Sequence, residues 1–345
     1  HYAHHQGMIL ASLANYLADH CLQNYFDSEP QMQAHETLLK EKVQVRPYID
    51  LQVTKYKRYQ YDKTQVESDA REYDHVANVP EAGILSNGSY MVVLDDRGGG
   101  FSRYKNVQLN RYRRVSSEYY GQFLYIRNLQ TDQLWCNTYA PLAVAPDRYR
   151  ITFASDRVKY MREDGGIETL TEITVAKDRN AEIRRFTFEN HTAHAVDLEL
   201  TTYGEVILCP RANDEAHRVF NGMTVYSEFD RANEALIFNK PARENVDATY
   251  YMVHKFFVDD ANETSQLQEG FEVQYETSRL KFLGRGNTTQ HAEVIETRQN
   301  LSGTVGTTLD PIMSMRRRVH IKAGRKARAY LIVGFGKSRE QLLRM

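Results

Sequence analysis

The chain has 345 residues, of which 41% are hydrophobic, and its formal net charge is −1. This near-neutral charge gives no electrostatic reason to expect nucleic acid or an anionic membrane as a partner. A mean hydropathy of −0.60, with no apolar run near the roughly 20 residues of a spanning helix, excludes an integral membrane chain.

The cysteines indicate the cellular compartment of the protein, and the first residue indicates whether the sequence is a whole polypeptide or a part of one. Cys21, Cys136 and Cys209 are few, odd in number and widely spaced. This usage is typical of a reducing compartment and supplies neither a disulfide framework nor a metal cluster, so we expect a cytoplasmic location. The chain starts at His1, without Met or a signal peptide, and we expect it to be a piece of a longer polypeptide.

Residues 1–45 are predicted to form a helical hairpin. Apolar residues recur at helical spacing from about Gln6 to Phe26. Asp27-Ser28-Glu29-Pro30 then indicates a stop and an N-cap with proline in the first turn. A second, antiparallel helix is predicted from about Gln31 to Val43. Residues 46–82 are predicted to be a polar connection, part of it an extended edge strand.

From Gly83 onward the chain is predicted to consist almost entirely of strands, separated by turn signals such as Gly165-Gly166 and Ala323-Gly324. Residues 181–208 are predicted to form the best-defined hairpin. The predicted fold class is mainly β, a large antiparallel sandwich preceded by the helical hairpin. The predicted strands are Gly121–Asn128, Tyr149–Ala154, Glu168–Val175, Ala181–Glu189, Ala195–Leu208, Thr224–Phe229, Ala235–Asn239, Thr249–Val258 and Arg317–Gly334.

The stretch from Ser86 to Arg114 is the strongest candidate for a functional site. An Asn-Gly turn precedes a β-favouring strand, which leads through Asp95-Asp96-Arg97 into three glycines, Gly98 to Gly100. Carboxylates, guanidinium groups and aromatic rings around this bare backbone can hydrogen-bond sugar hydroxyls and stack on a pyranose ring. An ordinary hairpin turn with a charged tip is the alternative interpretation. The candidate substrate-binding residues are Asp95, Asp96, Arg97, Ser102, Arg103 and Tyr104.

The other groups of histidine, arginine and acidic residues in the sequence predict neither a catalytic site nor a metal site. Position 8 is Met8, so His4 lacks the i, i+4 histidine partner of a metal-binding helix. Arg316-Arg317-Arg318 is predicted to be a solvated or ion-paired strand edge. Carboxylates are numerous, but no sequence pattern identifies a pair at the separation that glycoside chemistry requires.

Six ordered segments carry a family resemblance over about residues 83–339: LSNGSYMVVLDDRGGGFSRY, GQFLYIRNLQTDQLWCNTYAPL, YRITFASDRVKYMREDGGIETLTEITVAKDRNAEIRRFTFEN, LELTTYGEVIL, YETSRLKFLGRG and LDPIMSMRRRV. The series resembles the N-terminal β-sandwich of the inverting glycoside phosphorylases that include cellobiose and chitobiose phosphorylase. Within that family it is most similar to the C-terminal part of cyclic β-1,2-glucan synthases and to β-1,2-oligoglucan phosphorylases. The opening HYAHHQGMILASLANYL resembles the closing helices of the glucanase-like domain that precedes this region.

The resemblance implies where the domains begin and end, and which domain of the parent enzyme carries the catalytic residue. Residues 1–45 would end a preceding α/α domain, residues 46–82 connect, residues 83–339 form a galactose-mutarotase-like supersandwich, and residues 340–345 begin a linker. In the family an (α/α)6 barrel follows and supplies the aspartate that acts as general acid while phosphate attacks the anomeric carbon. No aspartate of this chain is then the acid, and we expect no turnover from it alone. Inorganic phosphate is expected only as co-substrate of the parent enzyme, with no other cofactor.

The glycine loop both keeps and departs from the family pattern. The loop has Gly98, Gly100, Ser102 and Arg103 in common with the family. It differs at Asp95-Asp96-Arg97, which precede the glycines, and at Phe101, where tyrosine is common in the family. Trp135, the lone tryptophan, lies in a strand of the family pattern, and core packing is favoured there over a stacking platform.

Two hypotheses follow. In the first, the chain is a non-catalytic sandwich that packs on the barrel of its parent chain and helps complete the cleft for a β-glucan oligosaccharide, the parent being bound to the inner membrane. In the second, it is an autonomous carbohydrate-binding module for β-glucan. A homodimer through the sandwich is a weaker third expectation, and no nucleic acid partner is expected.

Overall fold

The computed structural model describes residues 3–33, 70–113, 118–242, 249–259 and 271–344, together with the backbone of residues 265–267. The chain divides into two compact units, residues 1–64 and residues 65–345. The predicted second helix beyond residue 33 and the predicted connection before residue 70 lie outside the described residues. None of the helices in the described ranges combines the length and apolar character needed to cross a membrane.

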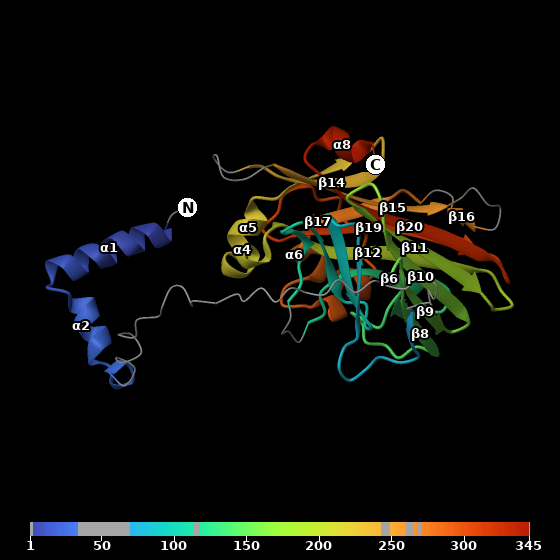
Figure 1. The fold of residues 1–345 in the computed structure, drawn as a ribbon, viewed down its shortest axis with the longest axis horizontal. Coiled ribbons are helices and arrows are strands. Elements are labelled where there is room, and N and C mark those ends of the chain that lie inside the picture. Colours follow the sequence, from blue (N-terminus) through green and yellow to red (C-terminus); the bar gives the residue numbers. More distant parts are fainter. Residues whose placement is uncertain are drawn as a thin grey trace, which may run out of the picture. The chain divides into compact units, whose positions relative to one another are not determined.

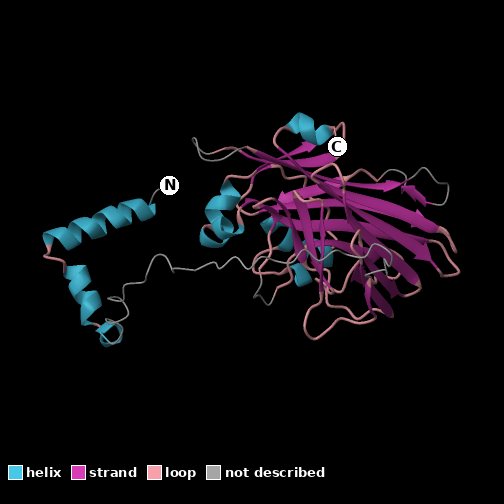
Figure 2. Ribbon diagram, viewed as in Figure 1, coloured by secondary structure: helices cyan, strands magenta, loops and turns pink. Residues whose placement is uncertain are grey.

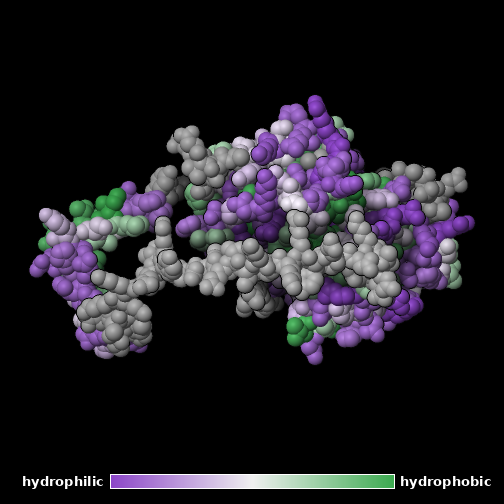
Figure 3. Space-filling view, in the orientation of Figure 1, coloured by the Kyte–Doolittle hydropathy of each residue, from purple (hydrophilic) through white to green (hydrophobic). Residues whose placement is uncertain are grey.

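The first unit is helical, as predicted, but its first helix is shorter than predicted. The expected single helix from Gln6 to Phe26 is instead α1 (Ala3–Leu17) and α2 (Cys21–Ser28). Asp19 and His20, both weak helix formers, adopt left-handed φ angles of 48° and 61° and break it. All apolar side chains of α1 are exposed, and Figure 3 shows them as green atoms on the surface of this unit. Residues 30–33 are again helical, where the second helix was expected to begin.

The second unit is a sandwich of antiparallel strands, which confirms the predicted fold class. In its described residues the strands form two ten-stranded sheets, with short helices at their margins (Figures 1 and 2). The first sheet runs β1 (Arg71–Tyr73), β8 (Arg148–Phe153), β9 (Val158–Asp164), β10 (Ile167–Val175), β11 (Ala181–Asn190), β20 (Lys326–Gly336), β15 (Tyr250–Asp259), β14 (Ala235–Lys240), β13 (Tyr226–Asp230) and β18 (Gly306–Thr307).

The second sheet is built around the long strand β12. It runs β16 (Ser265–Leu267), β19 (Pro311–Ile321), β12 (Val196–Cys209), β5 (Val107–Asn110), β4 (Gly100–Tyr104), β3 (Tyr90–Asp95) and β2 (Ala82–Ser86). In addition β17 (Gln274–Ser278) pairs with β19, β6 (Gln122–Asn128) pairs with β12, and β7 (Leu134–Cys136) pairs with β6. The helices are α4 (Arg211–Ala216), α5 (Arg218–Met223), α6 (Arg279–Leu283), η1 (Thr289–His291), α7 (Glu293–Glu296) and α8 (Arg339–Leu343).

The core lies between the two sheets and follows from the alternation of apolar residues along the strands. In β9 and β10 the buried residues alternate with half-buried ones, as expected for strands with one face inward. Trp135 is fully buried in this core, which confirms the predicted packing role. Each large apolar side chain buried in this way contributes roughly 1.5–3 kcal/mol of transfer free energy.

The predicted hairpin of residues 181–208 is wrong. Strand β11 pairs with β10 and β20 in the first sheet, whereas β12 pairs with β19, β5 and β6 in the second. The connection between them crosses from one sheet to the other, and so does the connection from β19 to β20. The side-chain amide of Asn190 ties the two crossings together, because it donates hydrogen bonds to His194 O at 2.7 Å and Ile321 O at 3.1 Å. Local alternation predicts the strands but not the sheet that each one joins.

The three consecutive arginines lie in the interior of the second sheet and not at its edge, which corrects part of the prediction. Strand β19 has partners on both sides, so Arg316 and Arg317 are 1% and 5% exposed. They are ion-paired, as the prediction allowed: Arg317 lies 2.6 Å from Glu234, and Arg318 lies 2.8 Å from Glu199. Buried guanidinium groups need such partners because desolvation penalises an isolated charge.

Candidate functional site

The glycine loop between β3 and β4 is held by one carboxylate. The Oδ1 atom of Asp95 accepts hydrogen bonds from the backbone N–H of Arg97 at 3.0 Å and of Gly99 at 2.7 Å. Gly98 and Gly100 have φ angles of 89° and 148°, which favour glycine. The N–H of Gly100 donates to the carbonyl of Tyr120 at 2.9 Å, so the loop is fixed to the segment before β6.

Asp96 and Arg97 at the tip of this loop keep unused hydrogen-bonding capacity. Asp96 Oδ2 accepts the N–H of Ala77 at 2.7 Å, but its Oδ1 is buried without a partner. Burial raises the pKa of the Asp96 carboxyl, although hydrogen bonds from Ala77 and the charge of Arg97 oppose this shift. Arg97 donates through Nη2 to the carbonyl of Ala77 at 3.2 Å, while its Nε is buried without a partner. The structure therefore brings Asp95, Asp96 and Arg97 together.

The other three predicted site residues point elsewhere. Ser102 is fully buried between the sheets, where its hydroxyl donates to Glu182 Oε1 at 2.5 Å. Arg103 is exposed, and the ring of Tyr104 stacks on Phe335 with 4.5 Å between centroids. Tyr104 pairs with Tyr90, at the opposite end of the hairpin from the glycines. The hydroxyl of Ser102 thus faces the protein interior, and the predicted set does not form one surface.

A cavity of about 740 Å³ opens beside Arg97. Residues 74–78 form one wall, and residues 145–150 form another. Tyr119 and Tyr139, both half-buried, add aromatic surface, and the exposed residues Arg148 and Arg150 add two further guanidinium groups. This mixture of phenolic rings, charged donors and acceptors can recognise a polar ligand that also has apolar faces.

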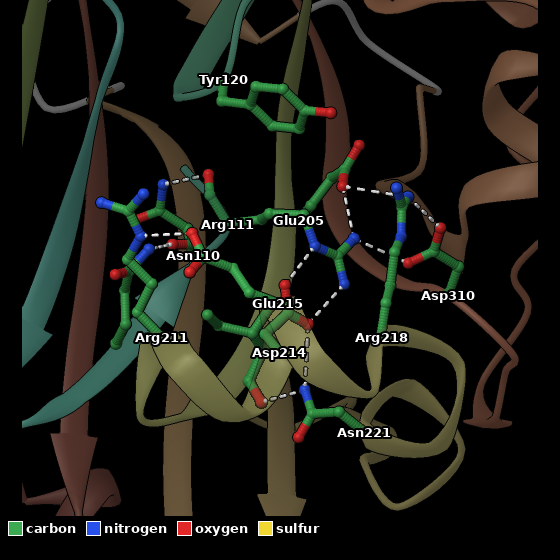
Figure 4. Close-up of polar contacts among 12 residues, drawn as sticks. Asn110, Arg111, Tyr120, Glu205, Arg211, Asp214, Glu215, Arg218, Asn221 and Asp310 are labelled. Carbon is green, nitrogen blue, oxygen red and sulfur yellow. Dashed lines mark hydrogen bonds and ion pairs between the residues drawn. The ribbon is translucent and has the colours of Figure 1, made fainter. Parts of the chain in front are cut away.

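A buried ion network at the neighbouring strand ends was not predicted from the sequence. The guanidinium group of Arg111, 1% exposed, is 2.6 Å from Glu205, 2.8 Å from Asp214 and 2.8 Å from Asp310. Figure 4 shows Glu205 and Asp310 turned toward both Arg111 and Arg218, Asp214 turned toward Arg111, and Tyr120 beside Glu205. The N–H of Arg111 also donates to the carbonyl of Glu205 at 2.9 Å, which continues the pairing of β5 with β12.

The outer members of this network reach the surface. Arg218 is 2.7 Å from Asp310, and Arg279 is 2.8 Å from Glu205. Burial would raise the pKa of Glu205, but the charges of Arg111 and Arg279 outweigh it and lower that pKa to about 2. A carboxyl that stays ionised down to such a pH is a poor proton donor at neutral pH.

Sequence reasoning missed the network because its members are far apart along the chain. The three partners of Arg111 lie 94, 103 and 199 residues away. The only local signal is an arginine directly after the buried strand Val107–Asn110, where an unpaired charge would be unfavourable. The described residues contain no group of three histidine, cysteine or acidic side chains arranged to hold a metal ion.

With this geometry established, comparison with known proteins assigns the family. The model of the glycosyl hydrolase 94 supersandwich domain matches residues 70–345. The chain belongs to this family. The chain is also 30% identical over 334 residues to the cyclic β-(1,2)-glucan synthase NdvB of Rhizobium meliloti (strain 1021). That match covers 94% of this chain and 11% of the relative, so the chain spans only a small part of the relative's length.

Solved structures resemble the supersandwich domain more distantly. A bacterial glucoamylase complexed with acarbose is 10% identical with a TM-score of 0.44, over 80% of this chain and 37% of that chain. A putative aldose 1-epimerase from Escherichia coli K12 is 6% identical with a TM-score of 0.40, over 75% of this chain and 100% of that chain.

Proposed function

We propose that this supersandwich domain is a non-catalytic part of a β-glucan-processing enzyme and packs against an (α/α)6 catalytic barrel of the same parent chain. Family membership and the name of the Rhizobium relative support a β-1,2-glucan as the substrate. The barrel would supply the general acid, and inorganic phosphate would be the co-substrate in a phosphorolytic parent. We further propose that the parent is a cytoplasmic or inner-membrane-bound protein.

The observation that carries this proposal is an apolar rim around the exposed side of the ion network. Val219, Leu280 and Leu309 are 64%, 65% and 70% exposed. Each directly adjoins a half-buried member of the network in sequence: Arg218, Arg279 and Asp310. Arg218 and Arg279 both contact Asp310, so Val219 in α5, Leu280 in α6 and Leu309 all adjoin members of one ion network in sequence. Helices α5 and α6 are labelled in Figure 1. Exposed apolar side chains gathered around arginines are typical of interaction surfaces.

The network suits an interface because its charges are already paired. Glu205 is held by Arg111 and Arg279, and Asp310 is held by Arg218, so little further desolvation is needed when the surface is covered. A rigid, neutralised patch with an apolar rim can pack against the barrel without leaving unpaired buried charge.

Replacing Leu309 with aspartate in the full-length parent enzyme is expected to lower kcat/KM for β-1,2-glucan by about tenfold, because a charge in the rim disfavours the contact with the barrel. Ile84, 61% exposed on the edge strand β2, gives the matched control Ile84→Asp, for which we expect unchanged kinetics. Thermal unfolding of both variants establishes that the domain still folds. Wild-type kinetics in Leu309→Asp would remove the proposed interface.

A further inference from the structure

We propose that Asn87 is a site of spontaneous deamidation, and that this modification breaks a contact between the two sheets of the sandwich. Asn87-Gly88 is one of two Asn-Gly sequences in the chain, and the other is Asn221-Gly222. Asparagine is most prone to this reaction when glycine follows it, because glycine has no side chain to hinder the attack of its backbone nitrogen. The site is independent of the proposed function.

The reaction needs no cofactor and no oxidant. The backbone nitrogen of Gly88 attacks the side-chain carbonyl carbon of Asn87, and the new C–N bond closes a cyclic succinimide. The side-chain nitrogen leaves as ammonia, together with the proton of the Gly88 amide. Water then opens the ring at either carbonyl, which gives aspartate or isoaspartate. Both products carry a carboxylate in place of the side-chain amide.

The turn that contains Asn87 is accessible and leaves room for this ring. Gly88 and Ser89 are exposed, and Asn87 is half-buried. Apart from the two chain neighbours of Gly88, no described residue lies within 4 Å of the position that a Cβ on this glycine would take. The backbone here can therefore reach the geometry of attack once the side chain of Asn87 is released.

The side chain of Asn87 joins the two sheets through its amide group. Its Oδ1 accepts the N–H of Ser89 at 3.0 Å and of Tyr90 at 2.8 Å, within the turn between β2 and β3. Its Nδ2 donates to the carbonyls of Ala176 and Arg179, both at 2.8 Å, in the turn between β10 and β11. Strands β2 and β3 belong to the second sheet, whereas β10 and β11 belong to the first.

A carboxylate at this position would break the contact, because it has no N–H to donate. Its charge would instead face two carbonyl oxygens that have lost their donor. The turn of residues 176–180 also contacts the C-terminal helix, since Nη1 of Arg179 donates to the carbonyl of Arg344 at 2.6 Å, directly after α8. Asn180 in the same turn accepts the N–H of Phe335 at 2.8 Å. Deamidation is thus expected to loosen the turn to which β20 and α8 are attached.

The second Asn-Gly sequence is an internal control in the same domain. Asn221 is 3% exposed and lies in α5, where helical dihedral angles turn the nitrogen of Gly222 away from the side chain of Asn221. A Cβ on Gly222 would lie 2.3 Å from the carbonyl oxygen of Leu309, so this backbone has no room to rearrange. Reaction at Asn221 therefore requires unfolding, whereas reaction at Asn87 requires only the opening of one turn.

Peptide mass spectrometry after incubation of this chain in mildly alkaline buffer tests the site. We expect aspartate and isoaspartate to replace Asn87 at least about ten times faster than Asn221, because a local opening costs less free energy than unfolding. In denaturant the two sequences should react at similar rates, which calibrates their intrinsic reactivity. Equal protection of Asn87 and Asn221 in the folded chain overturns the site. Aspartate without isoaspartate at this position also overturns it, since the succinimide gives both.

The variant Asn87→Asp tests the structural consequence, because it introduces the carboxylate without the reaction. We expect its midpoint of thermal unfolding to fall by at least about 2 °C, since two hydrogen bonds between the sheets are lost. Asn78→Asp is the matched control, because Asn78 is exposed and its side-chain amide donates to no described residue. Equal midpoints for the two variants would overturn the role of Asn87 in joining the sheets. These measurements use this chain alone, so their outcome is separable from the Leu309→Asp kinetics.

Discussion

Replacing Glu205 with glutamine is expected to lower the free energy of unfolding by about 3 kcal/mol at pH 7, because removing one partner of a buried ion pair leaves the others uncompensated. Glu205 has only 4% of its side chain exposed and lies 2.6 Å from Arg111 and 2.8 Å from Arg279. Chemical denaturation followed by the fluorescence of Trp135 measures this loss, since the single tryptophan is buried in the sandwich core.

The pH dependence of this loss has a defined sign. The pKa of Glu205 is lowered from 4.5 to about 2 in the folded protein, so its contribution to stability is fully present above pH 4.5. The contribution disappears as the pH falls from 4.5 toward 2, and the difference between the wild type and Glu205→Gln should shrink over that interval. Glu215→Gln removes an exposed partner of Arg211 and is the control, with an expected loss below about 1 kcal/mol. Equal losses in the two variants would contradict the role assigned to the network.

Gly100→Ala is the second substitution with a large expected effect, a loss of at least about 2 kcal/mol, because strained backbone alone costs roughly 1–3 kcal/mol. Gly100 has a φ of 148°, and a Cβ there would lie 1.9 Å from the carbonyl oxygen of Val93. Neither strand of the hairpin can move away without breaking the pairing of β3 with β4. Thermal and chemical unfolding of the variant measure the loss.

Gly99→Ala is the matched control for this prediction. Gly99 does not have a positive φ, and its nearest obstacle is the Oδ2 atom of Asp95 at 2.7 Å, not the Oδ1 atom that accepts the hydrogen bonds of the loop. We expect a loss below about 1 kcal/mol there. A loss for Gly99→Ala equal to that for Gly100→Ala would show that the loop, and not one backbone position, limits stability.

The strands of the sandwich were predictable from sequence because inward and outward residues alternate along them. The pairing of β11 and β12 was not, because both strands are strongly apolar and their connection is short enough for either a hairpin or a crossing between sheets. Asn190 fixes the crossing through carbonyls near residue 321, and no local pattern contains that information. The helix break at Asp19 and His20 was similarly hidden by apolar residues that continue on both sides of it.

The candidate site was predictable only in part. The sequence correctly placed Asp95, Asp96 and Arg97 together at a tight turn that contains the glycines. Their contact with a sugar stays a prediction. Ser102 lies on the inward face of β4, where the alternation of a strand places every second residue, and its partner Glu182 comes from the other sheet. The carboxylate partners of Arg111 are 94, 103 and 199 residues away from it in the sequence, so the network could be found only in the fold.

The central claim is that this supersandwich domain contributes structure and surface, but no proton donor, to a β-glucan-processing enzyme. The most direct measurement compares release of glucose or glucose phosphate from β-1,2-glucan by this chain alone and by the full-length parent, with and without inorganic phosphate. We predict turnover by the parent and none by the chain alone. Turnover by the chain alone would contradict the account.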